Sequence, residues 1–213
     1  MDFYFDFLSP YAYFAWLQTA DFCDEHNLTL NPVPVPFAGL LNHWGHLGPA
    51  EIPTKREFTF RNVLSYAKRN DIPLLGPKNH PFHPIASLRA AVAEASGNDQ
   101  FAVIDAIFKA GWSNGADLGD LAVLTDILNK RGLDGSAIMA RTKTPDVKAA
   151  LKANFDSAIE RGVFGVPTMF VDGLLFWGND QFVDIVNHIQ NGPVYSEAEL
   201  STFLAIQPAA IRK

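Results

Sequence analysis

The sequence predicts an α/β fold, a small sheet with a block of helices inserted between its strands. Three observations lead to this prediction. Apolar and polar residues alternate at the start of the chain, as they do in a strand. Residues 54–70 and roughly 85–162 carry helical spacing, and two further short strands follow residue 167. The element order is therefore β-α-β, a long helical block, and then β-β-α.

The first strand ends in a Ser-Pro pair that begins a helix. Phe3, Phe5 and Phe7 alternate with polar residues, and Ser9-Pro10 supplies the residue types favoured at the N-cap and the first helical position. Ser9 Oγ is thus expected beside unpaired helix amides, where the helix dipole favours a negative charge such as a thiolate. The alternative is that the pair is only a helix cap.

An edge strand and a loop are expected next. Residues 28–36 look extended, and prolines at alternate positions remove backbone donors, which favours a sheet edge. Residues 37–53 are rich in glycine and proline and are expected to form a loop that carries Trp44. A helix is expected over 54–70 and a second proline-rich loop over 73–84.

Capping residues and glycines divide the remainder of the chain. The next expected helices span 86–96, 101–110, 117–131 and 144–161, the first three closing at Gly97, Gly111 and Gly132. Strands are expected over 168–171 and 174–177, joined by Asp172-Gly173, which favours a hairpin turn, and a last helix is expected from near Asn179. The expected organisation is a discontinuous core of 1–36 and 163–192, a connecting active-site loop over 37–53, an inserted helical domain over 54–162 and a C-terminal extension over 193–213.

Composition excludes several classes of protein. The chain has 213 residues, 48% hydrophobic and 19% charged, as expected of a packed globular protein. A net charge of −6 argues against nucleic-acid binding. No apolar run has membrane-spanning length, and Asp2 and Asp6 interrupt any signal-like start, so a cytoplasmic protein without a membrane partner is expected. The single cysteine, Cys23, permits no internal disulfide and is expected to be a core residue.

Two later motifs add to the Ser9 corner. Gly165-Val166-Pro167-Thr168 precedes a strand, and a cis proline is expected there, with Val166 N–H and C=O turned outward so that a peptide can pair with them. An ordinary trans proline is the alternative. Trp177-Gly178-Asn179-Asp180 then offers a close backbone approach, amides for a carboxylate and an acidic partner for an ammonium group. A plain capping arrangement is the alternative.

These motifs resemble the 2-hydroxychromene-2-carboxylate isomerase family, which has a DsbA-like thioredoxin fold and is related to kappa-class glutathione transferases. The resemblance rests on Asp6-Phe7-Leu8-Ser9-Pro10, the helix containing Lys55, the loop at 165–168 and the motif at 176–180, and it covers roughly 1–185. It implies a thioredoxin-like (DsbA-like) core with an inserted α-helical domain. Ser9 and Ala12 occupy the positions of the two cysteines of redox-active relatives, so a disulfide oxidoreductase is excluded.

The resemblance implies that glutathione is the cofactor and that Ser9 is the catalytic residue, contacting and activating the glutathione sulfur. It places the rest of the tripeptide on Val166, Trp177, Gly178, Asn179 and Asp180. The implied function is a glutathione-dependent isomerase that converts 2-hydroxychromene-2-carboxylate to trans-o-hydroxybenzylidenepyruvate, or acts on a related aromatic-degradation intermediate, by reversible thiolate addition. A kappa-like glutathione transferase and a non-catalytic glutathione-binding module are the alternatives. The family often forms dimers, so a homodimer is also expected.

The substrate is expected to be a small aromatic carboxylate. Lys55 is the candidate for its carboxylate, ahead of Arg56 and Arg61, while Trp44 and His80 are candidates for contacts with the remainder. Each of these residues has an ordinary alternative as a solvated charge or a local packing residue.

Two departures from the family pattern are notable. Gln181 stands where the family usually has arginine, and Phe58 where it often has tyrosine, so glutathione binding or substrate choice is expected to differ. His80 and His83 lie three apart in a proline-interrupted loop, without the other ligands of a known metal motif. No metal is expected.

Overall fold

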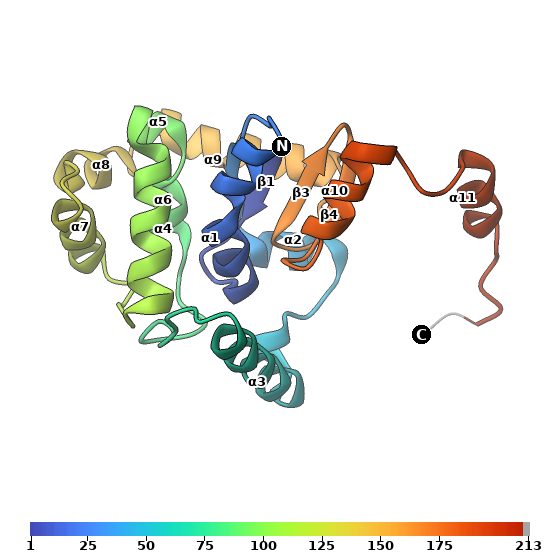
Figure 1. Ribbon diagram of the computed structural model, residues 1–213. Coiled ribbons are helices and arrows are strands. Elements are labelled where there is room, and N and C mark those ends of the chain that lie inside the picture. The colour runs from blue at the N-terminus through green and yellow to red at the C-terminus, as the bar shows by residue number, and fades with distance from the viewer. Residues whose placement is uncertain (211–213) are drawn as a thin grey trace. The chain divides into compact units, whose positions relative to one another are not determined.

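The computed structural model describes residues 1–210, which divide into two compact units. The first, Met1–Asn179, holds the sheet and the helical block together, and the second begins at Asp180. The α/β fold with many helices between the second and third strands is confirmed (Figure 1). The finer division into core, insertion and extension stays a prediction.

The sheet has four strands in the order β2-β1-β3-β4. They are β1 (Asp2–Phe5), β2 (Asn31–Pro34), β3 (Thr168–Val171) and β4 (Leu174–Trp177). β1 pairs in parallel with β2 and antiparallel with β3, which forms a hairpin with β4. The proline-containing β2 is an edge strand, as predicted. Asp172 and Gly173 both have positive φ, which this type of hairpin turn requires.

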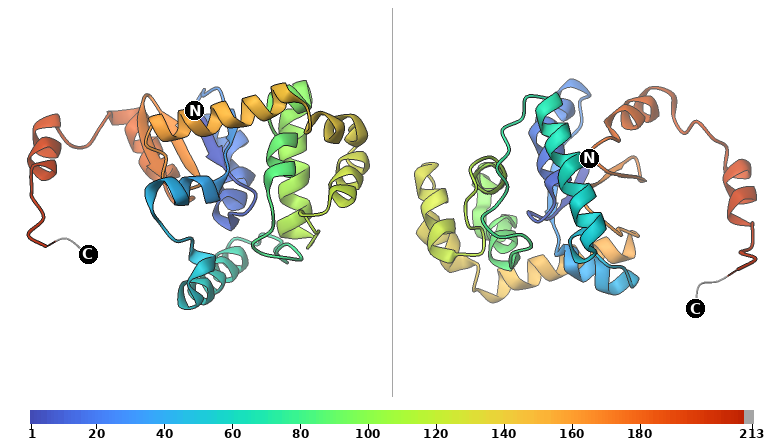
Figure 2. Two further views of the ribbon diagram at one scale, coloured as in Figure 1. Left: turned by 180° about the vertical axis from the view of Figure 1, so that it is seen from behind. Right: turned by 90° about the horizontal axis from the view of Figure 1, so that it is seen from below.

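Both faces of the sheet are covered. Phe3 and Phe5 are fully buried and pack against Trp16 of α1 (Pro10–Glu25), on one face. On the other face, Tyr4 belongs to a buried cluster that includes Ala158 of α9 (Pro145–Glu160). The left view of Figure 2, taken from behind, shows α9 running across the near side of the sheet. Because side chains alternate between the two faces of a strand, Phe3 and Phe5 pack in one apolar layer and Tyr4 packs in the other.

The helical block is more finely divided than its sequence pattern suggests. Its helices are α3 (Pro53–Arg69), α4 (Ile85–Ala90), α5 (Ala93–Ser96), α6 (Gln100–Phe108), α7 (Leu121–Lys130), α8 (Gly135–Arg141) and α9. The helices predicted over 54–70 and 144–161 are confirmed, as is the proline-rich loop at 73–84. The helix predicted over 86–96 is instead two short helices, and α8 was not predicted.

The prediction that 37–53 is a loop is wrong for its first half, which forms α2 (Phe37–Trp44). Two distant contacts hold this helix. The Phe37 N–H donates to Asp6 Oδ2 at 2.8 Å, and Gly39 lies so close to Phe155 that an added Cβ would be 2.8 Å from its ring. Glycine is required here for a close approach between α2 and α9, and it does not break the helix.

Gly111 was also misread as a helix end. A π-helical turn, Lys109–Ser113, continues α6 through this glycine. An added Cβ at Gly111 would lie 2.5 Å from Leu118 Cδ1, so glycine is present because Leu118 packs against the backbone. The turn presents Trp112, which is buried and bears on the site described below.

The second unit contains α10 (Phe182–Asn191) and α11 (Glu197–Leu204). The last helix predicted from near Asn179 therefore begins three residues later, after a turn. α11 starts in a capping box, in which Ser196 Oγ accepts from Glu199 N–H and Glu199 accepts from Ser196 N–H. Within residues 1–210, no helix combines the length and apolar character needed to cross a bilayer.

Candidate functional site

Ser9 lies where β1 gives way to α1, and its hydroxyl joins this corner to the loop before β3. Ser9 Oγ accepts a hydrogen bond from the Ala12 N–H at 3.1 Å, as predicted for an N-cap, and donates one to the Val166 carbonyl oxygen at 3.2 Å. The Val166–Pro167 peptide bond is cis. The fold thus brings the predicted sulfur-binding residue against the predicted backbone-pairing residue.

The backbone of Val166 presents one further polar group. Among residues 1–210, no atom accepts a hydrogen bond from the Val166 N–H, although the residue is only 7% exposed. A backbone donor in this position pairs with water or with a ligand. An extended peptide that pairs with it would extend the sheet's hydrogen bonding in the manner of an added strand.

Asp6 is a buried carboxyl group three residues before Ser9. Its side chain is fully buried and accepts the Leu8 N–H at 3.0 Å through one oxygen and the Phe37 N–H at 2.8 Å through the other. Burial raises the pKa of Asp6 to about 7, and the two backbone donors oppose that rise. One side chain therefore ties the Ser9 corner to the first turn of α2.

The predicted γ-glutamyl motif begins on the strand next to β3. Trp177, at the end of β4, is 53% exposed and packs over Gly165 and Phe164. An added Cβ at Gly165 would lie 2.6 Å from Trp177 Nε1, so this contact requires glycine. The Gly178 N–H donates to the Pro167 carbonyl oxygen at 3.0 Å. These contacts fix Trp177 and Gly178 next to the cis-proline loop.

The remainder of that motif spans the boundary between the two compact units. Asn179 is 9% exposed and ends the first unit, whereas Asp180 and Gln181 begin the second. Gln181, the residue that departs from the expected arginine, occupies the N-cap position of α10 and has no side-chain capping bond.

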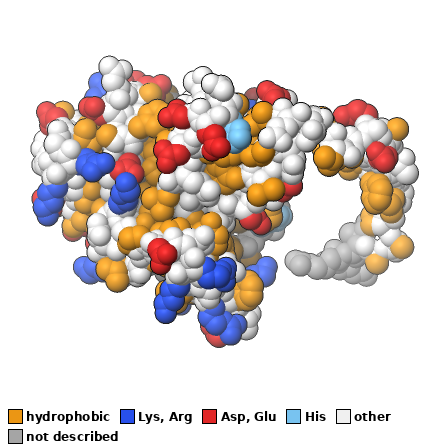
Figure 3. Space-filling model, in the orientation of Figure 1, with side chains coloured by type: hydrophobic (Ala, Val, Ile, Leu, Met, Phe, Trp, Pro, Cys, Tyr) orange, Lys and Arg blue, Asp and Glu red, His pale blue; other side chains and the backbone are white. Residues whose placement is uncertain are grey.

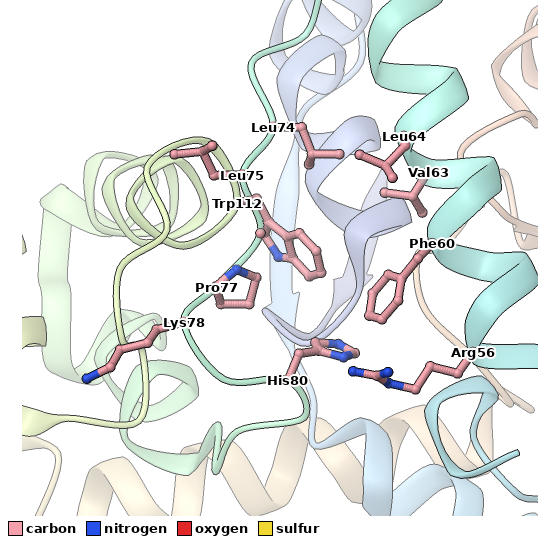
Figure 4. A pocket seen from close by; sticks show the side chains of 11 residues that line it. Arg56, Phe60, Val63, Leu64, Leu74, Leu75, Pro77, Lys78, His80 and Trp112 are labelled. Carbon is pink, nitrogen blue, oxygen red and sulfur yellow. The ribbon is translucent and has the colours of Figure 1, made fainter. Parts of the chain in front are cut away.

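A cavity of about 370 Å³ lies between α3, the 74–80 loop and the π-turn. Its lining is mostly apolar, with a few polar and charged side chains: Arg56, Phe60, Val63, Leu64, Leu74, Leu75, Gly76, Pro77, Lys78, His80 and Trp112. Figure 4 shows Arg56 and Phe60 reaching from α3 towards His80, with the Trp112 ring above His80 in this view. The Arg56 guanidinium lies 4.8 Å above the centre of the Phe60 ring.

Two side chains that line this cavity form hydrogen bonds with backbone carbonyl oxygens just before Ser9. His80 Nε2 lies 2.9 Å from the Leu8 carbonyl oxygen, and Trp112 Nε1 donates to the Phe7 carbonyl oxygen at 2.9 Å. The His80 ring also meets Trp112 and Phe60 edge-on, with ring centres 5.6 Å apart in both pairs. The cavity therefore adjoins the backbone that leads into Ser9.

The protonation state of His80 follows from its contacts. Burial lowers its pKa, the bond to Leu8 opposes this, and the Arg56 charge lowers it further, so the ring is neutral at neutral pH. A carbonyl oxygen only accepts, so we assign the proton to Nε2. Nδ1 is then an acceptor, and it is buried without a hydrogen-bond partner among residues 1–210.

The other predicted substrate residues lie outside the lining of this cavity. Lys55 and Arg56 are both exposed on the first turn of α3, and of the two only Arg56, which was ranked behind Lys55 together with Arg61, lines the cavity. Trp44 is 40% exposed, but its Nε1 donates to the Val163 carbonyl oxygen at 2.9 Å, which anchors the end of α2. Phe58 is 61% exposed and does not line the cavity either.

Sequence reasoning missed Phe60 and Trp112 as site residues. Phe60 lies in the predicted helix at four residues from Arg56, and this spacing places both on one helix face, so the pair was detectable. Trp112 offered no such signal, because the helix before it was expected to end at Gly111. Among residues 1–210, no group of three or more His, Cys, Asp or Glu side chains is arranged to hold a metal ion.

Comparisons with known proteins agree with this geometry. The DSBA-like thioredoxin domain family matches residues 1–190. A 2-hydroxychromene-2-carboxylate isomerase from Sphingobium xenophagum is 30% identical over 186 residues, which cover 85% of this chain and 93% of that protein. Glutathione S-transferase kappa 2 from Caenorhabditis elegans is 24% identical, over 79% of each chain.

A solved structure shows the same fold. The structure of a 2-hydroxychromene-2-carboxylate isomerase superposes with a TM-score of 0.80 at 24% identity, and covers 96% of this chain and 98% of its own. The similarity therefore includes both the segments that carry Ser9 and Val166, next to β1 and β3, and the helical block that supplies the cavity.

Proposed function

This chain belongs to the DSBA-like thioredoxin domain family and, within it, to the 2-hydroxychromene-2-carboxylate isomerases, and we propose that it is a glutathione-dependent isomerase of an aromatic carboxylate. The observation that carries this proposal is the contact between Ser9 Oγ and the cis-proline loop, beside an apolar cavity with one arginine. The preferred substrate is 2-hydroxychromene-2-carboxylate or a related intermediate of aromatic degradation.

The residues at the corner fit glutathione. Val166 offers a backbone donor that has no partner in the described part of the chain, and the cysteinyl unit of the tripeptide would pair with it. Trp177, Gly178, Asn179 and Asp180 would hold the γ-glutamyl end. The kappa-class relative, whose name includes glutathione, supports the same choice of cofactor. When bound, glutathione supplies a thiolate that adds reversibly to a conjugated double bond of the substrate, so rotation can occur before it leaves.

Ser9 would stabilise the negative charge on sulfur. Its hydroxyl donates to the Val166 carbonyl oxygen in the structure and needs only a rotation about χ1 or the C–O bond to donate elsewhere. Its position at the N-cap of the 16-residue α1 adds the favourable end of the helix dipole. Both effects lower the pKa of a thiol, which raises the thiolate fraction at neutral pH.

Arg56 would bind the substrate carboxylate, and the Phe60, His80 and Trp112 rings would contact its aromatic part. An arginine that is stacked on a ring is held in place, so it loses little freedom when it binds a carboxylate. Among the Phe60, His80 and Trp112 rings, the hydrogen-bond acceptor is Nδ1 of the neutral His80. Lys55 and Trp44 would then act from outside the cavity.

One experiment tests the proposal. The absorbance change on isomerisation of 2-hydroxychromene-2-carboxylate is followed with and without glutathione, and free thiol is assayed at the end. We expect turnover only with glutathione and full recovery of the thiol. Consumption of one thiol per substrate would instead indicate the second candidate, a glutathione transferase, which the kappa-class relative favours. Absence of turnover and binding would contradict both.

A further inference from the structure

We infer that Trp112 positions Ser9, because the π-turn aims its indole at the short backbone segment that leads into the serine. β1 ends at Phe5 and α1 begins at Pro10, so residues 6–8 lie outside the hydrogen bonding of the sheet and of the helix. A group that stabilises charge on a bound sulfur atom must be held closely in place, since small displacements of such a group lower the rate strongly. The inference rests on the proposed role of Ser9 and not on the identity of the substrate.

Side chains hold this segment, and Trp112 supplies one of the contacts. Trp112 Nε1 donates to the Phe7 carbonyl oxygen at 2.9 Å, and His80 Nε2 lies 2.9 Å from the carbonyl oxygen of Leu8, the next residue. Phe7 and Trp112 are 0% and 2% exposed, so water is poorly placed to replace the indole donor. Two rings that line the cavity therefore fix the two carbonyl groups that precede Ser9.

The π-turn, Lys109–Ser113, sets the direction of the Trp112 side chain. Asn114 N–H donates to the Lys109 carbonyl oxygen at 3.1 Å, five residues back, so the turn holds one residue more than a turn of α-helix. One extra residue changes the direction of the side chains at the end of the turn by about 100°. Turns of this kind are rare and occur frequently at functional sites. Here the turn gives the indole a direction that a continuous α-helix would not.

The π-turn is itself joined to the cavity loop and to α1. The Trp112 carbonyl oxygen accepts from the N–H groups of residues 75–76 at 2.8 and 2.9 Å. Ser113 Oγ lies 2.6 Å from the Tyr13 hydroxyl oxygen, and the Tyr13 N–H donates to the Ser9 carbonyl oxygen at 3.1 Å. The turn therefore reaches the Ser9 corner from both sides, through the segment before the serine and through the first turn of α1.

The positive charge of α3 is a second influence on the same corner. The helix carries five basic residues and one acidic residue, and Figure 3 shows Lys and Arg side chains gathered over it. Positive charge favours a thiolate, but salt screens exposed charges over distances beyond roughly 8–10 Å. A serine held in place by Trp112 acts on sulfur at contact distance, so its effect should persist in salt. Salt therefore separates the two influences.

A thiol introduced at position 9 tests the inference without glutathione. In Ser9→Cys the thiol takes the N-cap position, where the pKa of a thiol falls below its usual value of about 8.5. Native Cys23 is buried and should react slowly. The rate of alkylation by iodoacetamide as a function of pH gives the thiol pKa, at low and at high salt. We expect Ser9→Cys/Trp112→Phe, which keeps a ring but loses the indole N–H, to raise this pKa by about half a unit or more at both salt concentrations.

Two further substitutions, each made together with Ser9→Cys, sharpen the test. Trp44→Phe is the matched control: the Trp44 indole also donates to a backbone carbonyl oxygen at 2.9 Å, but that of Val163, so its loss should leave the thiol pKa unchanged. Gly111→Ala keeps the Trp112 indole, yet its added Cβ would lie 2.5 Å from Leu118 Cδ1, so the π-turn must shift. The thiol pKa should then rise as it does with Trp112→Phe. Circular dichroism checks that each variant is folded.

Four results would overturn the inference. They are an ordinary thiol pKa in Ser9→Cys, a thiol pKa that neither Trp112→Phe nor Gly111→Ala raises, an equal rise with Trp44→Phe, and a rise that high salt removes. None of these measurements uses glutathione or isomerase activity. Turnover with an unchanged thiol pKa would remove only this inference, whereas the expected rise without turnover would remove only the proposed function.

Discussion

Ser9 Oγ and the Val166 carbonyl oxygen are 3.2 Å apart, although 157 positions separate the two residues in the chain. This hydrogen bond joins the start of α1 to the loop that carries the cis proline, just before β3. A bound sulfur atom at this corner would compete with Val166 for the serine proton. This competition is the physical basis of the predictions about catalysis.

The first prediction concerns Ser9→Ala. Removing the hydroxyl leaves a bound thiolate without one hydrogen bond, which is worth about 1.5–3 kcal/mol when a charged group accepts it. We expect kcat to fall roughly tenfold to 150-fold, and the pH at which activity reaches half its plateau to rise. Steady-state kinetics across pH measure both. Ser9→Thr, which retains a hydroxyl, is the control, and unchanged kinetics in Ser9→Ala would contradict the assignment.

The second prediction separates Arg56 from Lys55. Arg56 lines the cavity and Lys55 does not, so Arg56→Gln should raise KM for the aromatic carboxylate about tenfold or more, with a smaller change in kcat. Lys55→Gln, the matched control on the same helical turn, should have kinetics within about twofold of the original protein. The reverse result would restore Lys55 as the carboxylate-binding residue.

The third prediction concerns Gly165→Ala. The added methyl group would lie 2.6 Å from Trp177 Nε1, so the indole must move from its place beside the loop. We expect glutathione to bind at least several-fold more weakly, while the far-ultraviolet circular dichroism stays unchanged. Calorimetric titration measures the affinity. Gly119→Ala is the control because its added Cβ would meet nothing closer than 3.4 Å, and equal affinity in both variants would exclude a role for Trp177.

The fourth prediction is a pH dependence of stability due to Asp6. Its pKa rises from 3.8 in the unfolded chain to about 7 in the folded protein, so the folded state binds the proton more tightly. Stability from this group is complete below pH 4 and is lost as the pH rises to about 7, amounting to roughly 4 kcal/mol at most. Denaturant titrations between pH 4 and 8 measure the slope.

Asp6→Asn provides the control for that slope. The variant cannot ionise, so its stability should vary less between pH 4 and 7 than that of the original protein. It should also be less stable at pH 4, because an amide nitrogen must face either the Leu8 or the Phe37 N–H. Identical pH slopes for the two proteins would show that Asp6 does not titrate in this range.

Much of the fold and the Ser9 corner could be predicted because the signals are local. A Ser-Pro cap, a Gly-Val-Pro-Thr loop and an Asp-Gly turn each act over a few residues. α2 could not be predicted, since the Asp6 carboxylate and the Phe155 ring that hold it lie far away in the sequence. The cavity could not be predicted either, because its lining comes from three segments that are distant in the sequence: α3, a proline-rich loop and a π-turn.

Local reasoning also could not tell which cation of an adjacent pair lines the cavity. Lys55 and Arg56 are neighbours in sequence, but successive residues on a helix are about 100° apart, so only one faces the cavity. The helical phase depends on which residues of α3 are buried, and Val63 and Ala67 fix it. That information lies in the tertiary packing.

The most direct test of the central claim is calorimetric titration of glutathione into the protein, with S-methylglutathione as the comparison. If Ser9 stabilises a thiolate, glutathione should bind with one site per chain, the methylated form should bind at least tenfold more weakly, and Ser9→Ala should remove most of that difference. Equal affinities for the two ligands, or no binding at millimolar glutathione, would contradict the claim that this corner holds a glutathione sulfur.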